Sequence, residues 1–272
     1  AYLRSEQFEP QAARIRSIAL FGKHISTRWI QLLTEYWRVA PHMAFYGLTE
    51  FNYANAGFYN LCAGFHFPSR VMPEFLSLDK TRRVNAGLGV LVLTSLYPFV
   101  ELQPLVRYCT DDVVEILPHC EAAGEPGIRF VGRLGTCVAV GEGVQRHLLL
   151  TAVDVLEALD GLPRVRIDTS SAERRFGKAI LAPNLDHLPG LPVFHMSIQA
   201  HQDGGGEVAL FVESDSESLD VGTRLRESVM DALVRVKPAL HVDLARHGIA
   251  LKVHVEPPGA LGRSNRFPVT AF

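Results

Sequence analysis

Five consecutive residues bring together side chains that could do chemistry as a group. Tyr46-Gly47-Leu48-Thr49-Glu50 supply an aromatic ring, a hydroxyl and a carboxylate. One interpretation is local: the glycine ends an apolar strand, and the Thr-Glu pair caps the loop or helix that follows. The other is that these three groups bind a ligand. A motif this short recurs by accident, so the rest of the chain has to decide between the two.

Two further stretches carry polar groups that suit a nucleotide. Asp111 and Asp112 follow the apolar run in PLVRYCTDDVV. Paired acids there usually cap a turn, but one carboxylate could instead accept hydrogen bonds from two vicinal hydroxyls of a ribose. About twenty residues later, Arg133 stands between Gly132 and Gly135 in FVGRLG. It is either a solvated hairpin residue or a planar donor for ribose oxygens or phosphate.

The first motif lies at the end of a predicted strand-helix-strand unit. An apolar run over residues 15–22 ends at a glycine, STRWIQLLTEYW has apolar residues at helical spacing with Ser26 as its N-cap, and HMAFYG is a second strand. Such units build parallel sheets, which bind ligands at the loops beyond the strand ends. We therefore expect residues 46 to 50 to lie at a ligand-binding edge.

The rest of the chain shows two different patterns of predicted secondary structure. Between residues 69 and 136, β runs alternate with Gly, Pro, Asn and Asp, which is typical of a meander or a distorted barrel packed beside the sheet. Later runs alternate as helix, hairpin, helix and strand, which indicates a small α+β domain with an antiparallel sheet. We place a boundary near residues 132 to 136.

Composition narrows the classes of protein. The 272 residues are 47% apolar, enough for one large or two ordinary domains, and the formal charge of -2 with a pI near 6.6 makes nucleic acid an unsuitable partner. The four cysteines form no CxxC pair, no run is long enough to span a membrane, and there is no signal-peptide core, so we expect a cytoplasmic protein. Because the chain begins with alanine, we expect a fragment or a chain trimmed at its N-terminus.

Taken together, the motifs and their order resemble the C-terminal portion of the phenylacetate-coenzyme A ligase branch of the acyl-adenylate-forming, AMP-binding enzymes. The resemblance covers most of residues 15 to 135 and continues more loosely to the end of the chain. The C-terminal segment VEPPGALGRSNR is similar to the family's pGtLPRSeGK. The segments that carry it are FYGLTE, GFHFPSRVMPEFLSLD, GVLVLTSLYP with PLVRYCTDD, FVGR and VEPPGALGRSNR.

The resemblance implies a fold and a reaction. The fold would be α/β plus α+β: residues 1–132 would form the parallel-sheet and β-barrel-like remainder of a large adenylate-forming domain, and residues 133–272 a small mobile α+β lid. In the reaction, a small carboxylic acid attacks the α-phosphate of ATP to form an acyl adenylate, and a thiol such as that of coenzyme A then attacks the adenylate. Positioning and charge neutralisation would do most of the catalysis.

The resemblance also assigns nucleotide contacts to particular residues. It implies that Tyr46, followed by Gly47, stacks on adenine and that Thr49 hydrogen-bonds a phosphate oxygen. Asp112 would hold the ribose hydroxyls, and Arg133 would contact ribose or phosphate near the interdomain hinge.

The implied catalytic groups are Thr49, Glu50 and Arg266. Glu50 would hold Mg²⁺, which prefers a few hard carboxylate oxygens together with phosphate and water. Arg266 stands where the family has a lysine that bridges the carboxylate and the α-phosphate, and arginine cannot copy a compact ammonium.

Other departures leave the present activity open. Asp111 replaces a glycine and adds negative charge, and Gly135 lies where a hinge acid is expected. The Ser/Thr/Gly-rich phosphate loop of the family has no counterpart in the chain, so a missing N-terminal segment or domain is an expected partner. The alternative is a truncated or degenerate homologue that acts as a non-catalytic nucleotide-binding or interaction module.

The sequence also contains two candidate zinc ligands, Cys62 and His66. Cys62 and His66 could bind zinc only with two further ligands, for which His42, Cys109 and Cys120 are the candidates; a buried thiol beside a hydrogen-bonded histidine is the preferred interpretation. The identity of the acid, the acceptor and the oligomeric state, with a homodimer among the alternatives, are left open.

Overall fold

The computed structural model describes residues 15–21, 24–51, 56–59, 62–99, 104–119, 126–141, 146–168, 191–200 and 205–261. The chain divides into two compact units. We call Ser17–Ile25 with Ala40–Val153 the sheet unit, and Ala1–Arg16 with Ser26–Val39 and Asp154–Phe272 the lid-side unit. Each is described by itself.

The predicted strand-helix-strand unit is present. Strand β1 (Ala19–Phe21) pairs in parallel with β2 (His42–Tyr46), and helix α2 (Thr27–Trp37) lies between them in sequence. The predicted N-cap is also confirmed, since the Ser26 side chain accepts a hydrogen bond from the Trp29 N–H at 3.3 Å.

Strands β1 to β8 of the sheet unit form one eight-stranded sheet in the order β1-β2-β3-β4-β8-β7-β6-β5. Only the β1–β2 pair is parallel. The expected meander exists as β5 to β8, but it does not pack beside the first strands, because Phe65 of β4 pairs with Ile128 of β8 and joins both parts into one sheet. The added strands are β3 (Ala56–Tyr59), β4 (Gly64–His66), β5 (Val71–Leu76), β6 (Gly87–Ser95), β7 (Tyr108–His119) and β8 (Pro126–Arg133).

The expected barrel is therefore not seen among the described strands. The sheet is open, with β1 and β5 as its two edges. Edge strand β5 contains Pro73, which has no N–H to offer to a further strand. The fold class is accordingly mixed α/β with a large, mostly antiparallel sheet.

Strand β6 is buried on both faces of this sheet. Leu91 and Leu93 join one apolar cluster, while Val90 joins another with Val113. All four side chains are completely buried. Because successive residues of a strand point to opposite faces, the continuous apolar run in GLGVLVLTS supplies side chains to both clusters, and β6 is paired on both sides, with β5 and β7.

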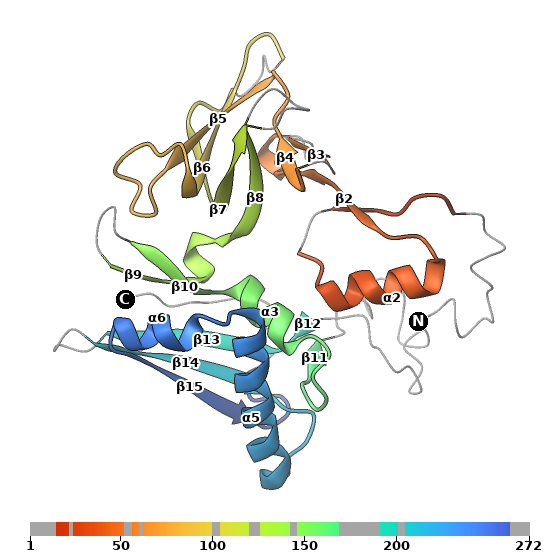
Figure 1. Cartoon of the computed structure of the whole chain (residues 1–272), viewed down its shortest axis with the longest axis vertical. Helices are drawn as coiled ribbons and strands as arrows, with labels where there is room; N and C mark the ends of the chain where they lie inside the picture. Colours follow the sequence, from red (N-terminus) through yellow and green to blue (C-terminus); the bar gives the residue numbers. More distant parts are fainter. Residues whose placement is uncertain are drawn as a thin grey trace. The chain divides into compact units, whose positions relative to one another are not determined.

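The lid-side unit contains a three-stranded sheet, β13 (Phe194–Ala200), β14 (Gly206–Glu213) and β15 (Ile249–Glu256). Helices α5 (Leu219–Val236) and α6 (Leu240–Arg246) contact β15 and cover one face of this sheet (Figure 1). The β13–β14 pair is antiparallel as expected, but β14 and β15 are parallel. The difference arises because the two helices form a crossover, which returns the chain to the end of the sheet where β14 began.

Shorter elements complete the described structure. Strand β8 pairs with β7, whereas β9 pairs with β10, so the two strands on either side of η3 do not form with each other the hairpin that one of the two interpretations of Arg133 requires. The division into domains of residues 1–132 and 133–272, with a boundary near residues 132 to 136, stays a prediction. No helix among the described residues is long and apolar enough to cross a membrane. The shorter elements are η2 (Thr49–Phe51), η3 (Leu134–Thr136), β9 (Cys137–Val140), β10 (His147–Thr151), α3 (Ala152–Leu159), β11 (Ile167–Asp168) and β12 (Leu191–Pro192).

Candidate functional site

Side chains from the end of β2 and from η2 form hydrogen bonds with side chains from the start of β7. The Tyr46 hydroxyl donates to Asp112 Oδ2 at 2.6 Å, across 66 residues of sequence. The Tyr108 hydroxyl donates to Glu50 Oε1 at 2.9 Å, across 58 residues. The two motifs that the sequence singles out thus form one cluster within the sheet unit.

A bulge in β7 separates the two neighbouring aspartates. The β6–β7 ladder is irregular at Leu91, and Asp111 has a φ of 60°, in the left-handed region that most side chains avoid. Thr110 closes the bulge, because its Oγ1 donates to the Leu91 carbonyl at 2.9 Å and accepts from the Asp112 N–H at 3.0 Å. The family's glycine at position 111 is the residue type that this backbone favours.

Asp112 is the buried acceptor at the centre of the cluster. Its residue is 3% exposed, and its carboxylate accepts from Tyr46 at Oδ2 and from Arg133 Nε at Oδ1, the latter at 3.1 Å. Arg133 is its direct register partner on β8. Asp112 raises the pKa of Arg133, mainly through this hydrogen bond. Burial, followed by the nearby Asp112 charge, raises the pKa of Tyr46, so Tyr46 stays a neutral donor.

The Tyr46 ring is packed in the core of the sheet unit. It is 9% exposed, and its centroid lies 6.2 Å from that of Phe65 and 6.4 Å from that of Phe67. The ring therefore stabilises the fold whatever it does with a ligand. Stacking on adenine stays a prediction, and it requires the ring to present more surface than it does in this conformation.

Glu50 is placed differently, on the exposed side of the cluster. It lies in η2 beside the exposed Thr49. Backbone hydrogen bonding and then the Tyr108 hydroxyl lower the pKa of Glu50, so its carboxylate is ionised at neutral pH. An ionised carboxylate in contact with solvent is a suitable Mg²⁺ ligand. Because the described residues contain no group of three His, Cys, Asp or Glu that could hold a metal, phosphate and water would have to supply the other ligands.

The charge of Asp111 is balanced by a residue that the sequence did not single out. Lys80 Nζ lies 2.5 Å from Asp111 Oδ1. Lys80 lowers the pKa of Asp111 through this hydrogen bond, and Asp111 raises the pKa of Lys80 in turn. The negative charge that Asp111 adds is therefore paired with the positive charge of Lys80.

The remaining predicted residues fall outside this cluster. Cys62 Sγ lies 2.9 Å from His66 Nε2, and no third ligand joins this pair among the residues that the structure describes. A side chain at Gly135 would meet only open space within 4 Å. Cys120 and Arg266 lie outside the described ranges.

Solved structures resemble this chain over nearly its whole length. An open conformation of 2-hydroxyisobutyryl-CoA ligase, in complex with 2-HIB-AMP and CoA, is similar over 99% of the chain with a TM-score of 0.57 and 15% identity. The anthranilate CoA ligase AuaEII in complex with anthranoyl-AMP is similar over 90%, with a TM-score of 0.51 and 10% identity. ATP-bound MatB from Rhodopseudomonas palustris is similar over 91%, with a TM-score of 0.51 and 13% identity.

The fold thus resembles part of the adenylate-forming ligases. The chain spans about half the length of these solved structures, 52%, 41% and 43% respectively. No family model matches the sequence, and no curated protein matches it. At these identities the likeness concerns the fold alone.

Proposed function

We propose that the chain supplies the nucleotide-binding and lid portion of an AMP-forming acid-thiol ligase of the phenylacetate-coenzyme A ligase type. The observation that carries the proposal is the convergence of the buried Tyr46 and Asp112 with the exposed Arg133, and with Glu50 tied to the exposed side of this cluster. These residues come from three separate stretches of sequence, and the fold that unites them resembles part of adenylate-forming ligases.

In the proposed reaction an oxygen of the carboxylic acid attacks the α-phosphorus of ATP. The bond from that phosphorus to the bridging oxygen breaks, and pyrophosphate leaves. A thiol such as that of coenzyme A then attacks the acyl carbon, and AMP leaves with the electron pair of the acyl-oxygen bond. The chain's contribution is to position the nucleotide and to neutralise its charge.

Each proposed role follows the chemistry of the group. Asp112 accepts from the ribose hydroxyls, since each carboxylate oxygen has a second lone pair beyond the one that Tyr46 or Arg133 uses. Tyr46 and Gly47 face the adenine, and Thr49 donates to a phosphate oxygen.

The cation and the lid complete the proposal. Glu50 holds Mg²⁺, which when bound supplies positive charge to the phosphates. Residues 133–272 act as the mobile lid and bring Arg266 to a phosphate.

The alternative function is a non-catalytic nucleotide-binding or interaction module. The burial of the Tyr46 ring favours only the interaction module, because this conformation offers adenine little ring surface. The two functions differ in chemistry: only a ligase exchanges labelled pyrophosphate into ATP in the presence of a carboxylic acid.

Calorimetric titration of the chain with AMP tests the shared part of both functions. We expect Asp112→Asn to weaken AMP binding at least tenfold, because the ribose loses a charged acceptor. Glu115→Gln is the matched control: Glu115 is an exposed acid on the same strand, paired with Arg129, and its substitution should change AMP affinity less than twofold. Equal affinities for the Asp112→Asn variant and the parent would refute the nucleotide site.

A further inference from the structure

The two halves of the cluster follow the same pattern. Tyr46 precedes Glu50 by four residues, and Tyr108 precedes Asp112 by four. Each tyrosine donates its hydroxyl proton to the acid of the other segment. Two reciprocal side-chain hydrogen bonds therefore link the segment formed by the end of β2 and η2 to the start of β7.

The bond from Tyr108 adds a second constraint to the Glu50 carboxylate, which a backbone hydrogen bond also holds. Glu50 is exposed, and a glutamate in contact with water samples many rotamers, which costs free energy to suppress. The Tyr108 ring is itself held, since its centroid lies 5.9 Å from that of Phe51 in η2 and the residue begins β7. The bond uses Oε1 of Glu50, and nothing in the described contacts of Tyr108 engages Oε2.

We propose that Tyr108 is a positioning residue that holds the Glu50 carboxylate so that its second oxygen faces the divalent cation of a nucleotide triphosphate. This inference rests on the proposed function, in which Glu50 binds that cation. Through the reciprocal bond of Tyr46 to Asp112, the cation ligand and the ribose acceptor are fixed to the same two segments. Tyr108 touches neither the nucleotide nor the cation.

The electrostatics agree with this role. The hydrogen bond to Glu50 raises the pKa of Tyr108, so the phenol remains a donor throughout the neutral range. Arg133 lies close enough to contribute to lowering the pKa of Glu50 as well as binding Asp112. The positive charge of Arg133 therefore acts on both Glu50 and Asp112.

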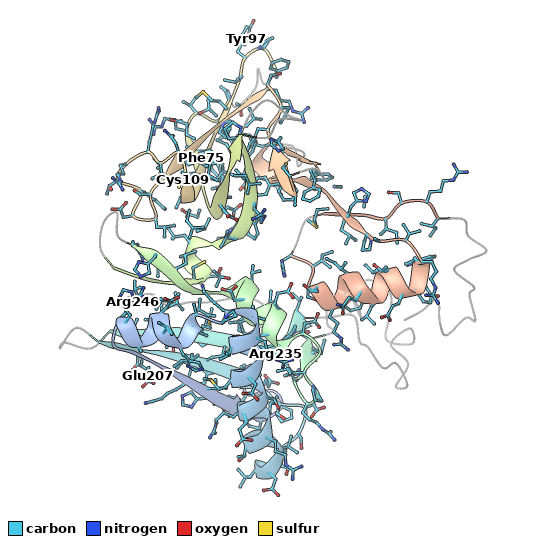
Figure 2. All side chains as sticks on the ribbon, in the orientation of Figure 1. Phe75, Tyr97, Cys109, Glu207, Arg235 and Arg246 are labelled. Carbon is cyan, nitrogen blue, oxygen red and sulfur yellow. The ribbon has the colours of Figure 1, made fainter. Side chains whose placement is uncertain are left out.

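The test compares metal-dependent with metal-free nucleotide binding by the whole chain. Calorimetry would measure ATP affinity with EDTA and with Mn²⁺ as the probe cation, and water-proton relaxation would report the bound Mn²⁺. We expect Tyr108→Phe, which keeps the ring, to weaken Mn²⁺-ATP binding about three- to tenfold and metal-free ATP binding less than twofold. Tyr97→Phe is the control, because Tyr97 is 82% exposed and projects from the end of the sheet unit (Figure 2).

A double variant separates positioning from a general loss of structure. If Tyr108 acts through Glu50, Tyr108→Phe adds no further loss of Mn²⁺-ATP affinity in a Glu50→Gln background. If Glu50→Gln removes the metal dependence while Tyr108→Phe does not reduce it, the positioning role is wrong and the proposed function stands. If Glu50→Gln leaves the metal dependence unchanged, the metal role in the proposed function is wrong, and the positioning role falls with it.

A second readout does not depend on nucleotide binding. Carbon-13 NMR titration of the glutamate carboxyls gives the pKa of Glu50 directly. We expect Tyr108→Phe to raise the pKa of Glu50, because the hydroxyl that favours its ionised form is gone. An unchanged pKa would show that the bond does not order Glu50 in solution and would overturn the inference, whether or not the chain binds ATP.

Discussion

The Tyr46-Asp112 hydrogen bond should be measurable as a coupling free energy in a double-mutant cycle. Tyr46→Phe removes only the hydroxyl and keeps the ring against Phe65 and Phe67. Asp112→Asn keeps the size of the side chain and removes its charge. The cycle therefore measures how much the charge of Asp112 strengthens one contact of 2.6 Å between two buried groups.

The expected magnitude follows from the burial and charge of the pair. A hydrogen bond to a charged group contributes about 1.5 to 3 kcal/mol. Asp112 keeps Arg133 when Tyr46 is changed, and 59% of the Arg133 side chain is exposed, so solvent already screens that second bond. We expect each single substitution to lower the unfolding free energy by about 2 kcal/mol, with a coupling of about 1.5 kcal/mol.

The assay has to report on the sheet unit alone. Both tryptophans lie in α2, which belongs to the lid-side unit, so tryptophan fluorescence would follow the wrong transition. Amide hydrogen exchange of the buried β6 strand under increasing denaturant follows the sheet unit instead. A coupling below about 0.3 kcal/mol, the usual error of additivity, would refute the hydrogen bond as a stabilising contact.

Alkaline pH provides an independent check of the same bond. Burial raises the pKa of Tyr46 in the folded state, so its contribution is fully present below the unfolded pKa of about 10. Above that pH the unfolded tyrosine loses its proton while the folded one keeps it. Stability should then fall by up to about 1.4 kcal/mol per pH unit in the parent, and less steeply in Tyr46→Phe. Parallel slopes for the two proteins would contradict the assignment.

Two further predictions concern ion pairs outside the nucleotide contacts. Lys80→Met should cost about 0.5 kcal/mol at pH 7, because the pair with Asp111 is half exposed. Since Lys80 lowers the pKa of Asp111, that cost should disappear as pH falls below the unfolded value of about 3.9, and an equal cost at pH 3 in denaturant titrations would count against the pair. Glu213→Gln should cost about 2 to 4 kcal/mol, because the fully buried Glu213 carboxylate accepts from Arg166 and from two backbone N–H groups. Hydrogen exchange of β14 would measure it, and a loss no larger than that of Glu207→Gln, on the same strand, would contradict it.

Local features of the fold could be predicted from the sequence. The Ser26 cap, the helix after it and the parallel β1–β2 pair all follow from residue types within a few positions of one another. The strands of the meander follow from apolar runs separated by turn residues. The joining of the meander to the first strands could not be predicted from the sequence. It depends on the pairing of Phe65 with Ile128, and no local pattern at either residue indicates the other as its partner.

The candidate site divides in the same way. Tyr46, Glu50, Asp112 and Arg133 were selected by residue type, spacing and resemblance, and their functional roles remain predictions. Tyr108 was not selected as a site residue from the sequence. Its spacing of four residues from Asp112 repeats the spacing of Tyr46 from Glu50, and this repeat is the sequence signal that could have indicated it.

The sequence by itself determined which groups are available and on which kind of element each lies. Only the tertiary structure decided their partners: Tyr46 with Asp112, Tyr108 with Glu50, and a lysine with Asp111. The physical reason is that a hydroxyl or an ammonium has no preference among carboxylates until the chain folds. Strand order and the bulge in β7 then bring one acid within 3 Å of each donor, and burial of the surrounding apolar side chains fixes that arrangement.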